Sequence, residues 1–122
     1  MKKIFTLSTC DTSKRILKES GILEEGFQIQ DLKKELISAS ELDEIKALTG
    51  SYEALFSRRA QKYKSLGLKN IKLTESQIRD LILEEYTFLK RPVIIDGSKY
   101  FVGNSKNTLS QLQQYIAAKN TQ

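Results

Sequence analysis

The order of the predicted elements indicates an α/β protein with a mixed four-stranded sheet. Two predicted strands flank a helix near the N-terminus, and two more strands followed by a helix lie near the C-terminus. Between these parts, over about residues 40–89, apolar residues recur at helical spacing. The predicted order is therefore β-α-β, an inserted helical block, then β-β-α, and we expect a single domain over residues 1–122.

The N-terminal part is predicted to be a strand–helix–strand unit. Apolar and polar residues alternate toward the end of residues 3–7, which predicts the first strand. A helix is expected over 11–20, because its apolar residues share a face and Gly21 is well placed to end it. Strict alternation over 27–30 predicts a second strand, and this short unit favours parallel pairing of the two strands.

The middle of the chain is predicted to be helical. Ser40, followed by acidic residues, is typical of a helix start, and helical spacing continues from there to Gly50. A second short helix is expected over about residues 52–56. The sequence Thr-Glu-Ser-Gln at 74–77 is a capping box, which predicts a third helix that continues to about Leu89.

The C-terminal part is predicted to be a hairpin followed by a helix. Residues 93–95 and 99–102 favour strands, and the Asp-Gly pair at 96–97 between them is a strong hairpin signal. Ser105 then opens a helix with an apolar stripe. This order of elements matches a thioredoxin-like sheet whose middle crossover is enlarged into several helices.

Composition limits the chemistry that the chain can perform. It carries 20 Lys+Arg, 15 Asp+Glu, one cysteine and no histidine, with a net charge of +5. A Cys–His dyad, a His-based metal site and an internal disulfide are therefore excluded. Because acids and bases are interspersed, we interpret the basic balance as solubility plus an anion site, not nucleic-acid binding. The sequence has neither a signal peptide nor a membrane span, so we expect a cytoplasmic monomer.

The one cysteine, Cys10, lies where the first predicted strand ends and the first helix begins. Backbone N–H groups at the start of a helix lack partners, and together with the helix dipole they stabilise a thiolate. The same amides, near Asp11, Thr12 and Ser13, would bind an oxyanion in front of the sulfur. The alternative is a buried structural cysteine. The polar neighbours of Cys10 favour the reactive interpretation.

Ser13 makes the motif C-x-x-S rather than C-x-x-C. Without a second thiol, Cys10 cannot close an internal disulfide. Turnover through a mixed disulfide must then be completed by an external thiol, such as glutathione or a glutaredoxin.

Three arginines are candidates for anion binding beside Cys10. Arg91 precedes Pro92, the only proline, at the entrance to the third predicted strand. A cis-proline at this point of a thioredoxin-like fold faces the start of the active-site helix, so Arg91 would point its guanidinium toward the thiolate. The alternative is a solvated arginine. Arg58 and Arg59 end the predicted short helix, where they either complement its dipole or supply one side chain to the anion pocket.

Three segments together resemble the ArsC family of arsenate reductases. FTLSTCDTSKRIL at 5–17 is similar to the active-site segment, LFSRRAQKYKSLGL at 55–68 to the arginine segment, and LKRPVII at 89–95 to the Arg-Pro strand. The resemblance runs from residue 3 to about 117 and extends especially to "CDT" members of the family. It implies a thioredoxin-like fold, Cys10 as nucleophile, no bound cofactor, and electrons from glutathione and glutaredoxin.

The resemblance also implies which arginines surround the cysteine. Arsenate reductases of this type use three, and Arg91 matches one of them. Ser57 falls at the arsenate-reductase position of the second, whereas Arg59 fits the related Spx-type and "CDT" branches. The third falls at about Gly103, so that cation is absent. Losing one charge-assisted hydrogen bond costs about tenfold or more in oxyanion binding.

The expected function is therefore a glutathione-linked thiol oxidoreductase acting on a small-molecule oxyanion or a mixed disulfide. The alternative is an Spx-like regulator, which resembles this family in fold but binds RNA polymerase. Spx carries a C-x-x-C redox switch, so Ser13 counts against the regulator.

Overall fold

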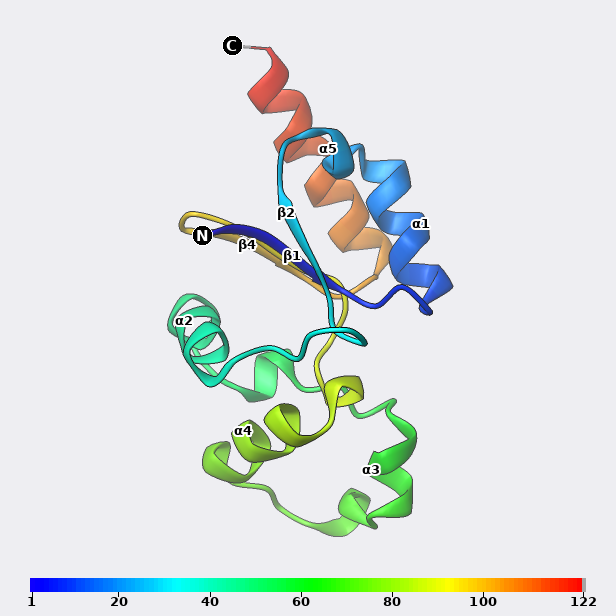
Figure 1. The fold of residues 1–122 in the computed structure, drawn as a ribbon, viewed down its shortest axis with the longest axis vertical. Helices are drawn as coiled ribbons and strands as arrows, with labels where there is room; N and C mark the ends of the chain where they lie inside the picture. The colour runs from blue at the N-terminus through cyan, green and yellow to red at the C-terminus, as the bar shows by residue number, and fades with distance from the viewer. Residues whose placement is uncertain (122) are drawn as a thin grey trace. The chain divides into compact units, whose positions relative to one another are not determined.

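The computed structural model describes residues 1–121, which form two compact units (Figure 1). The first unit contains residues 1–35 together with those from 91 onward, and the second contains residues 36–90. No helix in the described part of the chain is long and apolar enough to cross a membrane.

The first unit is built on a mixed sheet with the strand order β2-β1-β3-β4. The strands are β1 (Lys2–Thr6), β2 (Gln28–Asp31), β3 (Val93–Asp96) and β4 (Lys99–Val102). β1 pairs parallel with β2 and antiparallel with β3, and β3 pairs antiparallel with β4. The predicted mixed four-stranded sheet is confirmed, with each strand end within one residue of its predicted position.

Two helices, α1 (Asp11–Ser20) and α5 (Lys106–Asn120), lie side by side on one face of this sheet (Figure 1). Gly21 ends α1 and Ser105 begins α5, as predicted. Gly21 closes α1 in the left-handed region, with a φ of 80°, and its N–H donates to the Lys18 carbonyl at 3.3 Å. The Ser105 hydroxyl caps α5 by accepting from the Thr108 N–H at 3.1 Å.

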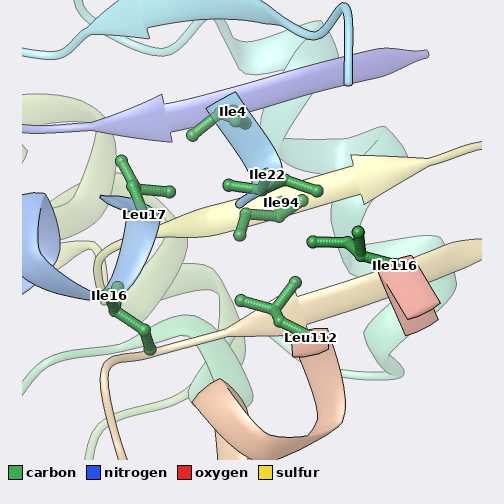
Figure 2. Close-up of a cluster of buried hydrophobic side chains, with 7 residues drawn as sticks. All are labelled: Ile4, Ile16, Leu17, Ile22, Ile94, Leu112 and Ile116. Atoms are coloured by element: carbon green, nitrogen blue, oxygen red, sulfur yellow. The ribbon is translucent and has the colours of Figure 1, made fainter. Parts of the chain in front are cut away.

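The core between these helices and the sheet is a cluster of isoleucines and leucines (Figure 2). Ile4 of β1 and Ile94 of β3 are register partners, and both are fully buried on this face. Side chains from α1, α5 and the turn η1 (Ile22–Glu24) complete the cluster, namely Ile16, Leu17, Ile22, Leu112 and Ile116. Full burial of one such side chain contributes about 1.5–3 kcal/mol. This packing fixes the start of α1, and with it residue 10, against the sheet.

The two central strands are buried on both faces. Phe5 and Val93 are register partners that point away from α1 and α5, and both have an exposed fraction of 0%. Burial on both faces explains why residues 93–95 form an unbroken apolar run rather than an alternating one.

The second unit is helical, as predicted, with α2 (Ala39–Thr49), α3 (Gln61–Ser65) and α4 (Glu75–Glu84). The predicted start at Ser40 is wrong, because Ser38 caps α2. Its hydroxyl accepts from the Glu41 N–H at 3.0 Å, and the Glu41 carboxylate accepts from the Ser38 N–H at 3.1 Å. This reciprocal capping box satisfies two helix-end amides, which Ser40 cannot do from inside the first turn.

The predicted short helix near residues 52–56 is a single 3-10 turn, η2 (Glu53–Leu55). Arg58 and Arg59 therefore do not end a helix. They lie in a turn that precedes α3, after Phe56 has adopted extended backbone. The helix-dipole role considered for these arginines does not apply.

The capping box at Thr74 is confirmed, because its hydroxyl accepts from the Gln77 N–H at 3.2 Å. The predicted continuation of α4 to Leu89 is wrong. The helix ends at Glu84 because Glu85 is extended, with a φ of −135°. The Glu85 carboxylate then accepts from the Thr87 hydroxyl at 3.1 Å and caps a separate 3-10 turn, η4 (Tyr86–Phe88).

A charged cluster ties α2 to α4. Arg79 of α4 donates two hydrogen bonds to the Asp43 carboxylate of α2, at 2.8 and 3.0 Å. The Tyr52 hydroxyl donates to the same carboxylate at 2.6 Å. These partners, Arg79 first, lower the pKa of Asp43 to about 2.

Candidate active site

Cys10 lies at the N-cap of α1, directly after the loop that follows β1. Its backbone is extended, with φ −97° and ψ 103°, and its carbonyl accepts the first helical hydrogen bond from the Lys14 N–H at 3.1 Å. The Cys10 N–H donates back to the Leu7 carbonyl at 3.0 Å, which closes a tight turn. The half-buried thiol is therefore held at the positive end of the helix, as predicted.

Ser13 supplies the direct polar contact to the sulfur. Its side chain is fully buried, and its hydroxyl donates to Cys10 Sγ at 3.1 Å. A residue three positions after an N-cap faces the capping side chain, which explains the contact. In a C-x-x-C motif this position carries the second sulfur. Here it carries a hydrogen-bond donor instead.

The environment of Cys10 favours the thiolate. Burial raises the pKa of the Cys10 thiol, but hydrogen bonding from the Ser13 hydroxyl and backbone N–H, together with the nearby Arg91 guanidinium, lowers the pKa by more. The net pKa lies below that of an ordinary thiol. Of the groups that lower this pKa, the Ser13 hydroxyl makes the largest contribution.

Arg91 and Pro92 join the site from the start of β3. The peptide bond between them is cis, as predicted, and Pro92 is buried. The Pro92 carbonyl accepts from the Gly103 N–H at 2.9 Å, which extends the pairing of β3 with β4. Arg91 is close enough to the sulfur to lower the pKa of Cys10. The structure thus brings Cys10, Ser13 and Arg91 together.

The other predicted site residues differ in how the structure places them. Asp11 and Thr12 are exposed in the first turn of α1, beside Cys10, and their role in binding stays a prediction. Arg59 is exposed in the second unit, so its membership of the site also stays a prediction. Arg58 contacts its own unit, with its guanidinium 3.1 Å from the Glu53 carboxylate and 5.5 Å from the centre of the Phe56 ring.

Gly103 occupies the position at which the resemblance implies a third arginine. Its φ is 94°, in the left-handed region that disfavours any residue with a side chain. A Cβ atom at this position would meet no atom within 4 Å, so the space itself is open. Backbone conformation, rather than crowding, favours glycine here.

Asp31 is a site residue that the sequence analysis did not single out. It ends β2, and its Oδ1 accepts from the Ser8 N–H at 3.2 Å and from the Lys33 N–H at 3.1 Å. The Ser8 side chain makes the largest contribution to lowering the pKa of the Asp31 carboxyl. Ser8 belongs to the loop that leads to Cys10, so Asp31 is a positioning residue. The sequence feature that could have indicated this role is the position of Asp31, a carboxylate at the end of a strand predicted to run parallel to the first.

The first unit combines a four-stranded mixed sheet, a hydrogen-bonded cysteine at the start of the first helix and a cis-proline at the start of the third strand. Together these features define a thioredoxin-like protein with a thiol site. Residues 5–112 match the ArsC family, and the chain belongs to this family. Among residues 1–121, no group of three or more His, Cys, Asp or Glu side chains is arranged to hold a metal ion.

Similar proteins include both regulators and reductases. The regulatory protein MgsR of Bacillus subtilis is 27% identical over 108 residues, covering 88% of this chain and 83% of MgsR. A putative arsenate reductase from Yersinia pestis superimposes with a TM-score of 0.73 at 18% identity, covering 96% of this chain and 99% of that one. A possible arsenate reductase from Streptococcus mutans gives a TM-score of 0.70 at 23% identity, covering 87% and 92%. The two solved structures establish that the fold is shared.

Proposed function

We propose that the protein is a thiol oxidoreductase that uses Cys10 as nucleophile and glutathione, directly or through a glutaredoxin, as reductant. The contact that carries this proposal is the hydrogen bond from the buried Ser13 hydroxyl to Cys10 Sγ, at 3.1 Å. Together with Arg91, it supports a thiolate in a half-exposed position that a substrate sulfur can reach. Such a reduced thiol suits the cytoplasm.

The proposed reaction is thiol–disulfide exchange. The Cys10 thiolate attacks one sulfur of a mixed disulfide, so that a new S–S bond forms to Cys10 and the other sulfur leaves as a thiolate. A second thiolate, from glutathione or glutaredoxin, then attacks this bond and releases Cys10. When the substrate is a glutathione mixed disulfide and Cys10 attacks its glutathione sulfur, each cycle releases the substrate thiol, consumes one glutathione thiol and forms one oxidised glutathione, half of which comes from the substrate. Ser13 does not enter the exchange but stabilises Cys10 as both the attacking and the leaving thiolate.

A disulfide substrate suits this site better than arsenate does. Arg91 is the arginine that lowers the pKa of Cys10, whereas the third position of the family pattern holds Gly103. An oxyanion needs several charge-assisted hydrogen bonds, and losing one weakens its binding by about tenfold or more. Disulfide exchange needs only an activated and accessible thiolate.

The test is turnover of a glutathione mixed disulfide, with glutathione reductase and NADPH reporting the oxidised glutathione that forms. The wild-type chain is compared with Cys10→Ser, with and without a glutaredoxin, and in parallel with arsenate. We expect NADPH consumption above background that Cys10→Ser abolishes, and a far lower rate with arsenate. Equal rates for the wild type and Cys10→Ser would refute the proposal.

The likeness to MgsR supports a second candidate, an Spx-like regulator that binds RNA polymerase. This relative is named a regulatory protein and matches 88% of the chain. Purified RNA polymerase mixed with the wild type or Cys10→Ser separates the two candidates in size-exclusion chromatography. Co-elution of RNA polymerase with the wild type and also with Cys10→Ser, without disulfide turnover, would establish the regulator. Turnover without co-elution would establish the enzyme.

A further inference from the structure

The positive charge of the protein is concentrated in one part of the second unit. Between Glu53 and Glu75 the sequence contains six lysines and arginines and no acidic residue, which gives this segment a charge of +6. The whole chain has a net charge of +5, so the remaining residues together carry −1. We call residues 54–74 the basic segment. Its cations are Arg58, Arg59, Lys62, Lys64, Lys69 and Lys72.

The cations of the basic segment face solvent, and all six side chains are exposed. Arg58 is paired with Glu53 at 3.1 Å. Within residues 1–121, none of the other five makes a salt bridge. Like charges held close together on a surface destabilise the fold unless an opposite charge is present. The basic segment is therefore electrostatically complementary to an anionic partner.

The basic segment also exposes two large apolar side chains. Leu66 has an exposed fraction of 52% and Ile71 of 50%, so both present apolar surface among the lysines. The segment is anchored beneath them. Ala60 and Leu68 are buried, and Tyr63 packs edge-on against Phe56 with ring centres 6.1 Å apart. These two exposed aliphatic side chains give the basic segment apolar surface in addition to its positive charge.

We infer that the basic segment binds an acidic protein surface that also carries apolar side chains. Phosphate groups would satisfy the lysines but leave Leu66 and Ile71 exposed. Stacking on bases requires exposed aromatic side chains, whereas the two aromatic residues of the basic segment are the buried Phe56 and the half-buried Tyr63. A helix lying on a lipid surface is excluded by length, because α3 has only 5 residues. A protein with carboxylates around aliphatic side chains satisfies both features at once.

The test measures the anisotropy of fluorescent probes titrated with the full chain, at about 50 mM and about 200 mM salt. The probes are a peptide of glutamate and leucine at helical spacing, a polyglutamate of equal charge, and a mixed-sequence DNA duplex. Vesicles containing anionic phospholipid are tested by co-sedimentation. We expect the glutamate–leucine peptide to bind about fivefold or more tightly than polyglutamate, because only its leucines can cover the exposed aliphatic surface.

Two variants separate charge from apolar contact. Lys62→Glu/Lys64→Glu is expected to weaken peptide binding by about tenfold or more at low salt, whereas the matched control Lys33→Glu/Lys34→Glu, in the first unit, changes it little. Leu66→Ser/Ile71→Ser is expected to remove the preference for the leucine-containing peptide while retaining polyglutamate binding. Circular dichroism establishes that each variant is folded.

Three results would overturn the inference. The first is tighter binding of the duplex or the vesicles than of the glutamate–leucine peptide. The second is an equal loss of binding in the control variant, which would indicate attraction to net charge alone. The third is no binding of any probe. Cys10 takes no part in this binding, so we expect Cys10→Ser to bind the glutamate–leucine peptide as the wild type does. A failure of the proposed oxidoreductase function would therefore leave this inference standing.

Discussion

Replacing Ser13 with alanine tests the chemistry of the site most directly. The substitution removes the hydroxyl that donates to Cys10 Sγ at 3.1 Å and changes little else, because Ser13 is fully buried inside a helix that tolerates alanine. The burial that raises the pKa of Cys10 remains, while the largest opposing contribution is lost. We expect the pKa of Cys10 to rise.

The size of this rise follows from the strength of the lost bond. A hydrogen bond to a charged group contributes about 1.5–3 kcal/mol, and one pKa unit corresponds to about 1.4 kcal/mol. Since sulfur is a weak acceptor, we take the lower end and expect a rise of about one unit. The thiolate fraction at neutral pH then falls by up to about tenfold. Each remaining thiolate is more nucleophilic, so the alkylation rate falls by only about threefold.

The assay is the rate of Cys10 alkylation by iodoacetamide as a function of pH, followed by intact-mass spectrometry. A single cysteine makes the labelled site unambiguous. The matched control is Ser76→Ala, which makes the same chemical change at an exposed helical position of α4. The reasoning would be refuted if the midpoint for Ser13→Ala matched that of the wild type and the control.

Four further results are expected. Arg91→Gln raises the pKa of Cys10, measured in the same alkylation assay, because it removes the Arg91 charge, which lowers this pKa. Ser13→Cys places a second thiol beside Cys10, so oxidised glutathione closes an internal disulfide that intact mass detects as the loss of two hydrogens. Leu112→Ala lowers the free energy of unfolding by about 2–5 kcal/mol in urea, because Leu112 is fully buried in the core cluster. Asp43 has a folded pKa of about 2, below the usual value. Its pair with Arg79 therefore stabilises the fold above about pH 4 and is lost as pH falls, so Asp43→Asn is less stable than the wild type at neutral pH, by a difference that shrinks in acid unfolding below about pH 4.

The sequence predicted the first unit closely because local signals and tertiary packing agree there. Gly21 and Ser105 bound their helices through their own backbone and hydroxyl groups, so neighbouring residues suffice to place them. The Asp-Gly turn likewise sets the hairpin between β3 and β4. Cys10, Ser13, Arg91 and Pro92 could then be placed by their order along these elements.

The second unit was predicted less accurately because its helix ends depend on competing caps. Both Ser38 and Ser40 precede acidic residues, and only the geometry of the Glu41 side chain selects Ser38. At the end of α4, the Glu85 carboxylate accepts a hydrogen bond from the Thr87 hydroxyl and caps the next turn instead of continuing the helix. The spacing of apolar residues in the sequence does not reveal this. Charge counted over the whole chain also hid the basic segment. The exposure of its cations, and the pairing of Arg58 with Glu53, emerge only from the structure.

The sequence by itself determined the order of the elements, the single cysteine and the absence of a second thiol, since these depend on residue type and spacing. Only the tertiary structure decided the direction of the Cys10 pKa shift, because burial raises this pKa while Ser13 and Arg91 lower it. Opposing contributions of this kind depend on distance and exposure. The same is true of Asp31, whose carboxylate reaches the loop before Cys10 across 23 residues of sequence because β1 and β2 are parallel neighbours.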